Sequence, residues 1–277
     1  MTVYEIVTEK IVAALDAGVV PWHKPWSGGV SGNANFKTKH VYTGVNQMLT
    51  AIAGYACPYW LTYKQAASMG GQVRKGEKGT LITFWKIWDR EVEGKEKKVP
   101  VFRYFTVFNL EQIDGIEWEQ PAAAEHADPI AEAQQIVDAY HGPVVKHASQ
   151  DRAFYRPDSD TVMMPQIGQF ESREAYHQTL FHELVHSTGH ESRLERGIRN
   201  GFGDNRYARE ELVAEIGAAM LMASAGLEPR IEESAAYIAS WKRRLQEDPK
   251  LIVTAASAGQ KAVEFITHDS EAEKQVA

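Results

Sequence analysis

The stretch Thr179–His190, TLFHELVHSTGH, decides how the C-terminal half of this 277-residue chain folds. It contains His182, Glu183 and His186 in the pattern H-E-x-x-H. On an α-helix, residues four apart lie on one face, so both imidazoles can bind one Zn²⁺ at about 2.0–2.1 Å. Glu183 cannot reach the same metal. Its carboxylate projects toward a water at the metal and can act as a general base.

The residues around this motif predict the helix that it needs. Ser172 is a suitable N-cap, Tyr176, Leu180 and Leu184 form an apolar stripe, and Gly189 ends the helix. The alternative is a helix that carries two core-facing histidines by chance, since the pattern is only five residues long. The helical context favours the metal site.

A third protein ligand, which would leave an open fourth position, is expected on the next predicted helix, residues 207–226. This helix carries Glu210, Glu211 and Glu215. A solvated charged turn suits Glu210, whereas an acid among small apolar residues is costly unless it is paired or bound to metal. We predict that Glu211 is the ligand and that Glu215 holds a ligating histidine. The reverse assignment stays open.

Composition limits the classes of protein that are possible. No run of 18 apolar residues occurs, so no membrane-spanning helix is predicted, and the N-terminus lacks the apolar stretch of a signal peptide. Cys57 is the single cysteine, which excludes an internal disulfide and fits a cytoplasmic protein. We expect Cys57 to be a packing residue, because nothing nearby in the sequence resembles an activating base.

The sequence predicts an α+β fold of two domains, with a small α+β domain at residues 1–118, a linker at 119–128 and a mainly helical domain with a short β-sheet at 129–277. Expected in the first domain are helices at 2–17 and from an N-cap at Thr62, strands at 79–88 and 100–108, and a solvated loop at 89–98. Expected in the second are a helix at 129–141, two strands around Pro157–Asp160, and helices near 172–189, 207–226, 230–247 and 250–267.

Charge is divided unevenly along the chain. Residues 1–120 carry fourteen basic and twelve acidic side chains, a net charge of +2, whereas the remainder has a net charge of −9. Residues 20–88 carry eight basic residues, one acid and eleven aromatics. Cations interleaved with aromatics suit single-stranded nucleic acid, because lysine and arginine contact phosphates while exposed rings stack on bases. The alternative is that these aromatics build the core of a small domain.

We name the following residues as candidate DNA contacts: Trp22, Lys24, Trp26, Lys37, Lys39, Tyr42, Asn46, Trp60, Tyr63, Lys64, Arg74, Lys75 and Lys78. Near the H-E-x-x-H helix, the residues Arg193, Arg196, Arg206 and Tyr207 are candidate substrate contacts or parts of an exposed basic loop.

Two long segments resemble one known family. The segment VPWHKPW…YTGVNQML…YWLTYKQAASMGGQVRKGEKGTLITFW is similar to the N-terminal domain of ArdC-type antirestriction proteins. The segment YHQTLFHELVHSTGHESRLERG…YAREELVAEIGAAML is similar to the zincin-like metallopeptidase domain that follows it in that family. The resemblance covers about residues 3–226.

The resemblance implies a bacterial, plasmid- or mobile-element-encoded protein of the cytoplasm. Such a protein would bind single-stranded DNA and protect incoming conjugative DNA from type I restriction. It also implies that His182 and His186 bind Zn²⁺, or Mn²⁺ or another divalent metal, with Glu183 as the general base. Two hypotheses follow. In one, the second domain is a peptidase that cleaves a restriction-system or DNA-associated protein. In the other, the metal is structural and protection comes from binding DNA or the restriction enzyme.

Overall fold

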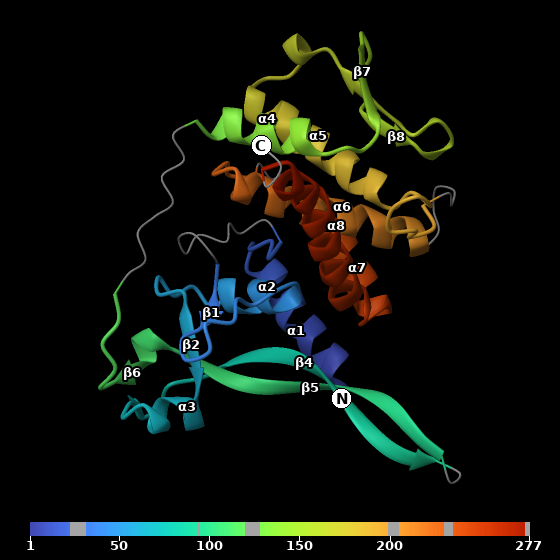
Figure 1. Ribbon diagram of the computed structural model, residues 1–277. Coiled ribbons are helices and arrows are strands. Elements are labelled where there is room, and N and C mark those ends of the chain that lie inside the picture. The colour runs from blue at the N-terminus through green and yellow to red at the C-terminus, as the bar shows by residue number, and fades with distance from the viewer. Residues whose placement is uncertain (23–31, 93–94, 120–127, 199–204, 230–234, 275–277) are drawn as a thin grey trace. The chain divides into compact units, whose positions relative to one another are not determined.

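The computed structural model describes residues 1–22, 32–92, 95–119, 128–198, 205–229 and 235–274 (Figure 1). Contacts divide the chain into two compact units. The N-terminal unit consists of Met1–Pro21 and Trp26–Ala123, and the C-terminal unit of Trp22–Pro25 and Ala124–Ala277. Except for its two end residues, the predicted linker 119–128 lies outside the described residues.

Local sequence signals set the helices of the N-terminal unit. Helix α1, Val3–Asp16, begins at a capping box in which Thr2 accepts from the Glu5 amide and Glu5 accepts from the Thr2 amide. Helix α3, Tyr63–Ser68, begins in the same way at Thr62. These helices confirm the predictions at 2–17 and from Thr62. A third helix, α2, spans Val45–Ala51.

A four-stranded sheet forms the centre of this unit. Its strand order is β1-β2-β5-β4, in which β1 and β2 are parallel and the other pairs antiparallel. The strands are β1 Ala34–Asn35, β2 Tyr59–Thr62, β4 Thr80–Val92 and β5 Lys95–Asn109. A 3₁₀ turn, η1 Leu110–Gln112, leads from β5 to a second, two-stranded sheet formed by β3, Gln72–Val73, and β6, Ile113–Asp114.

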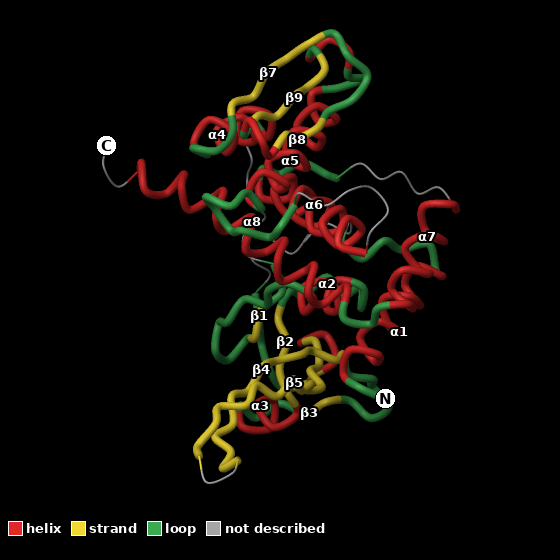
Figure 2. The backbone as a smooth tube through the Cα atoms, turned by 90° about the vertical axis from the view of Figure 1, so that its right-hand side faces the viewer, coloured by secondary structure: helices red, strands yellow, loops and turns green. Residues whose placement is uncertain are grey.

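The β4–β5 hairpin is longer than predicted. Of residues 89–98, expected to be a loop, 89–92 continue β4 and 95–98 begin β5, with Arg90 opposite Lys97 and Val92 opposite Lys95. Figure 2 shows the long hairpin. The prediction of a loop was wrong. Strands in a two-stranded ribbon are joined by backbone hydrogen bonds, which do not depend on side-chain polarity, so charged residues can also form them.

The buried residues of the N-terminal unit include two apolar clusters, one around Cys57 and one around Trp60. Cys57 is fully buried in a cluster with Leu61 and Leu110. This burial in the core confirms Cys57 as a packing residue. The same burial raises the pKa of its thiol to about 11, which disfavours the reactive thiolate. Asn46 joins α2 to β4, because its side-chain amide accepts from the Thr83 amide and donates to the Thr83 carbonyl, both at 2.7 Å.

The C-terminal unit is mainly helical, as predicted, with one small sheet. The strands are β7 Val144–Ala148, β8 Phe154–Arg156 and β9 Thr161–Pro165, in the order β7-β9-β8. The two strands expected around Pro157–Asp160 are confirmed as β8 and β9, which are joined by the 3₁₀ turn η2, Pro157–Ser159, while β7 was not anticipated. The helices are α4 Pro129–Ala139, α5 Arg173–Thr188, α6 Asn205–Ser224, α7 Ala235–Glu247 and α8 Leu251–Lys274.

Helix α6 is the central element of this unit and packs against both α5 and α8 (Figure 1). Two glycines permit the close approach. A Cβ on Gly217 would lie 2.7 Å from a Val185 methyl of α5, and a Cβ on Gly259 of α8 would lie 3.1 Å from Ile216. In the described part of the chain, no helix combines the length and the apolar composition that crossing a membrane requires.

Candidate functional site

Helix α5 presents the two histidines of the motif to one point. It begins at Ser172, whose hydroxyl accepts from the Ala175 amide at 3.1 Å, and ends at Thr188 before Gly189. The spacing of four residues places His182 and His186 one turn apart, with their Nε2 atoms separated by 3.1 Å. Both ring nitrogens therefore face the same small volume.

Helix α6 brings Glu211 to this point. Its carboxylate oxygens lie 3.7 Å from His182 Nε2 and 3.5 Å from His186 Nε2. Among the described residues, these three form the one group of His, Cys, Asp or Glu side chains that could hold a metal, with ligand atoms all within 4.8 Å of one another. Two imidazole nitrogens and one carboxylate oxygen suit Zn²⁺ or Mn²⁺, so the residues fit a divalent ion.

Glu210 differs from its expected role as part of a solvated turn. Its side chain is only 14% exposed, and one carboxylate oxygen lies 3.4 Å from His186 Nδ1. Arg196 holds this carboxylate with two bonds, Nη2 to Oε1 at 2.7 Å and Nε to Oε2 at 3.1 Å. A hydrogen on His186 Nδ1 that is donated to Glu210 leaves Nε2 as the free ligand atom. Glu210 thus occupies the orienting position that is predicted from the sequence for Glu215.

Glu215 has other partners. Its carboxylate accepts a hydrogen bond from the Tyr237 hydroxyl and another from Trp22 Nε1 at 3.1 Å. Trp22 is fully buried and packs edge-on against Trp241, with ring centroids 6.0 Å apart. Glu215 lies one helical turn beyond Glu211, and the group of possible ligands among the described residues does not contain it.

Buried carboxylates control the protonation of the site. Burial raises the pKa of Glu210, but hydrogen bonds from His186 and Arg196 outweigh it and give a net lowering. The pKa of Glu211 is lowered in the same way, against its own burial, by hydrogen bonds from His182 and Tyr207 and by the charge of His186. For His186, burial lowers the pKa, yet the surrounding carboxylates raise it overall. The centre therefore favours positive charge.

A cleft of about 550 Å³ opens over the three residues. Glu183 lines it and is only 8% exposed. Tyr207 also lines it. Burial and the nearby Glu211 carboxylate raise its pKa to about 12, which keeps the hydroxyl protonated at neutral pH. The exposed side chains of Arg152 and Arg209 lie on the rim of the cleft.

Arg196 and Arg193, which follow the motif, both form hydrogen bonds within the protein. Arg196 lines the cleft, but its guanidinium is used by Glu210, Thr188 and the Val185 carbonyl. Arg193 pairs with Asp160 through both Nη atoms and donates to the Ser187 carbonyl at 2.8 Å, which ties the end of α5 to the start of β9. The side chain of Arg206 lies outside the described part of the chain.

The candidate DNA contacts separate into buried and exposed sets. Burial removes Trp22, Tyr42 and Trp60 from the surface, and the Trp60 indole donates to Asn33 at 2.9 Å. Asn46 is used in holding β4. Lys24 and Trp26 lie outside the described residues. The remaining candidates are exposed: Lys37, Lys39, Tyr63, Lys64, Arg74, Lys75 and Lys78.

Three exposed aromatics are absent from the candidate DNA contacts, although Trp85 is one of the eleven aromatics counted in residues 20–88. Trp85, Tyr104 and Phe105 on the β4–β5 hairpin are 56%, 47% and 52% exposed. Phe105 stacks on Phe84 with ring centroids 4.3 Å apart, which leaves one of its faces to solvent. The signal that could have found them is the length of the hairpin, because a two-stranded ribbon beyond the sheet has no layer to cover both faces.

Comparison with known proteins assigns a family to each unit. Residues 1–108 match the family described as the N-terminal domain of anti-restriction factor ArdC. Residues 131–258 match the family described as zincin-like metallopeptidase.

Relatives of known sequence include one of similar length. The uncharacterized protein y4eC of Sinorhizobium fredii is 35% identical over 99% of this chain and 94% of its own length. Two Escherichia coli proteins named DNA primase TraC are 39% and 38% identical over 95% of this chain. The chain spans only 27% and 20% of the length of these two.

Two solved structures resemble the whole chain. Both are of the antirestriction ArdC protein from the R388 plasmid. The metal-free form has a TM-score of 0.81 and 39% identity, and covers 98% of this chain and 99% of its own. The Mn(II)-bound form has a TM-score of 0.79 and 37% identity, and covers 98% of both chains.

The ion pair between Arg196 and Glu210 predicts that replacing Arg196 destabilises the C-terminal unit. Arg196→Met keeps the apolar stem but leaves the Glu210 carboxylate buried without its guanidinium. We expect a loss of about 3–5 kcal/mol in the free energy of unfolding of the C-terminal unit. Urea titration with hydrogen exchange of α5 and α6 amides measures it.

The control is Arg209→Met, which removes an exposed arginine from the same cleft. It should change the unfolding free energy by no more than about 0.5 kcal/mol. Equal stability of the two variants would show that Glu210 does not depend on Arg196.

Proposed function

Since the chain belongs to the ArdC-type antirestriction family, we propose that it binds single-stranded DNA and protects incoming conjugative plasmid DNA from host type I restriction. We propose further that its C-terminal unit is a zinc-dependent peptidase. The observation that carries the second part is the placement of Glu183 in the cleft that opens over His182, His186 and Glu211.

The proposed peptidase site assigns a separate task to each residue. His182, His186 and Glu211 would hold the metal, and Glu210 would fix the orientation of the His186 ring. When bound, the ion supplies a Lewis acid that polarises a peptide carbonyl and acidifies water. The Glu183 carboxylate takes the proton from the attacking water and passes it to the leaving amine nitrogen. Tyr207 also lines the cleft, and its hydroxyl donates to the Glu211 carboxylate, which would fix the orientation of this ligand.

The identity of the metal is part of the proposal. Two histidines and one carboxylate are a donor set that catalytic zinc sites use, and imidazole with carboxylate also suits Mn²⁺. The Mn(II)-bound relative from the R388 plasmid supports a divalent ion in this family. We propose Zn²⁺ as the working ion, with Mn²⁺ as an ion that the site also accepts.

Exposed cations of the N-terminal unit support the DNA-binding part of the proposal. Lys37, Lys64, Lys75 and Lys78 are all exposed on this unit. Lysines of this kind attract phosphates through charge and carry no sequence information. The exposed rings Tyr63, Trp85 and Phe105 offer faces on which unpaired bases can stack.

A non-enzymatic protein is the second candidate function. In that case the metal braces α5 against α6, and protection comes from DNA or from binding of the restriction enzyme. Glu183 separates the two candidates, because a purely structural metal site has no use for a carboxylate in the cleft.

The choice of the third ligand gives a first prediction. Glu211→Gln should lower the affinity of the full chain for Mn²⁺ and Zn²⁺ by about tenfold or more, since it removes an anionic ligand. Glu215→Gln is the matched control on the same helix and should leave metal affinity within about twofold. Isothermal titration calorimetry measures both. Loss of metal binding in Glu215→Gln alone would assign the ligand to Glu215.

Catalysis gives a second prediction. Glu183→Gln should keep the metal but lose protection of a plasmid transferred by conjugation into a restricting recipient. The reason is that a missing general base slows proton transfer by about 10²–10⁴-fold. Transfer frequency is compared between wild type, the variant and an empty control. Full protection by a folded, metal-binding variant would contradict the peptidase and favour the non-enzymatic candidate.

DNA binding gives a third prediction. Replacement of Lys64, Lys75 and Lys78 by Gln should reduce the slope of log Kd against log salt for a single-stranded oligonucleotide by about 2, because each phosphate contact contributes about 0.7. Lys146→Gln, an exposed lysine of the C-terminal unit, is the control and should leave the slope unchanged. Fluorescence anisotropy measures the slopes. A wild-type Kd that does not depend on salt would argue against phosphate contacts.

A further inference from the structure

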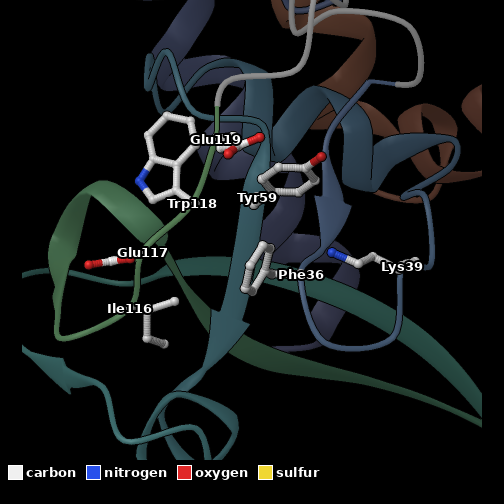
Figure 3. Close-up of a pocket in the computed structure, with 7 residues that line it drawn as sticks. All are labelled: Phe36, Lys39, Tyr59, Ile116, Glu117, Trp118 and Glu119. Carbon is white, nitrogen blue, oxygen red and sulfur yellow. The ribbon is translucent and has the colours of Figure 1, made fainter.

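The N-terminal unit has an open hollow of about 750 Å³ whose lining differs from the lysine-rich surface (Figure 3). Phe36 and Tyr59 lie on one side of it, with ring centroids 5.2 Å apart. The segment that carries Ile116, Trp118 and Glu119 lies on the other side. The rings of Phe36, Tyr59 and Trp118 are half-buried and pack against the core beneath the hollow, which holds them in place.

The Phe36 side of the hollow is fixed by a buried asparagine. The Asn35 side chain, on a residue that is 8% exposed, accepts from the amides of Lys37 and Thr38 at 3.1 and 3.0 Å. The turn that follows places Lys39 in the left-handed region, with φ of 59°. The Lys39 ammonium consequently lies over the Phe36 ring at 4.1 Å and over Tyr59 at 5.2 Å. In Figure 3 it approaches Phe36 from the side away from Ile116 and Trp118.

The charges around the hollow restrict what it can bind. A second cation is disfavoured because the Lys39 ammonium already lies over the two rings. A phosphate is disfavoured because Glu117 and Glu119 line the same hollow. The ligand that remains suitable is a neutral, flat ring that stacks on an aromatic side chain and donates hydrogen bonds to a carboxylate.

We propose that this hollow binds one base of single-stranded DNA and selects a base with an exocyclic amino group. The base stacks against the aromatic side chains, and its amino group donates to Glu119, whose carboxylate points toward Tyr59 in Figure 3. Cytosine offers its N4 amino group in this way, whereas thymine presents a carbonyl oxygen that the carboxylate repels. This inference rests on the proposed binding of single-stranded DNA and adds a base preference to it.

The probes are twelve-residue oligomers of deoxycytidine and of thymidine, bound to the full chain and measured by fluorescence anisotropy. We expect wild type to prefer the deoxycytidine oligomer by about fivefold or more, which is the discrimination of one carboxylate–amino contact. Glu119→Gln should remove this preference, because the amide can also donate to thymine. It should not weaken overall binding, since it removes a negative charge.

The matched control is Glu117→Gln, which removes the same charge two residues away from a carboxylate that points away from the rings in Figure 3. It should keep the wild-type ratio of the two affinities. Phe36→Leu should weaken binding of both oligomers by about fivefold or more, because it removes a stacking face. Its folding is checked by the unchanged thermal transition of the unit.

The outcomes separate the two proposals. A wild-type chain that binds neither oligomer overturns the proposed binding of single-stranded DNA. Binding with equal affinity for both oligomers, or a preference that Glu119→Gln and Glu117→Gln change alike, overturns the base pocket and leaves the DNA-binding proposal intact.

Discussion

The close packing of α5 on α6 is the constraint on which the candidate metal centre depends. Two ligand candidates come from α5 and the third from α6, so neither helix can form the group alone. Gly217 sets the distance between these helices, because any side chain there would collide with Val185. The positions of the three ligand candidates therefore depend on how tightly the core around them is packed. Helix α8 supports that core through its own close contact with α6 at Gly259.

The sequence allowed the motif helix to be predicted, but only part of its surroundings. His182 and His186 share a face because of a local period of four, which needs no tertiary information. The roles of Glu210 and Glu215 did depend on tertiary contacts. Glu210 is buried because Arg196, fourteen residues earlier and beyond the end of α5, folds back onto it. Helix α6 is apolar on nearly all sides, so its polar pattern does not reveal which acid faces which neighbour.

The tryptophans of the N-terminal half illustrate the same limit. From the sequence, Trp22 and Trp60 are candidate DNA contacts, yet both are fully buried. Each finds an acceptor for its indole N–H that is distant in the chain, Glu215 for Trp22 and Asn33 for Trp60. A buried tryptophan needs such an acceptor, and sequence patterns do not show where one exists. The exposed rings of Trp85, Tyr104 and Phe105 instead belong to the hairpin, whose extension beyond residue 88 could not be predicted from its charged residues.

The buried acids of the C-terminal unit explain why a divalent ion suits this centre. Carboxylates away from water are costly unless donors surround them. Arg196 satisfies Glu210, and Tyr237 with Trp22 satisfies Glu215. Glu211 is satisfied by the two histidines and Tyr207, and His186, whose Nδ1 hydrogen is donated to Glu210, can also donate from Nε2 only when it is protonated. The negative field that raises the pKa of His186 is the same field that attracts a cation. A proton and a metal ion therefore compete for the imidazole nitrogens. A divalent ion neutralises more of the negative field than a proton does, and it binds the histidines in their neutral form.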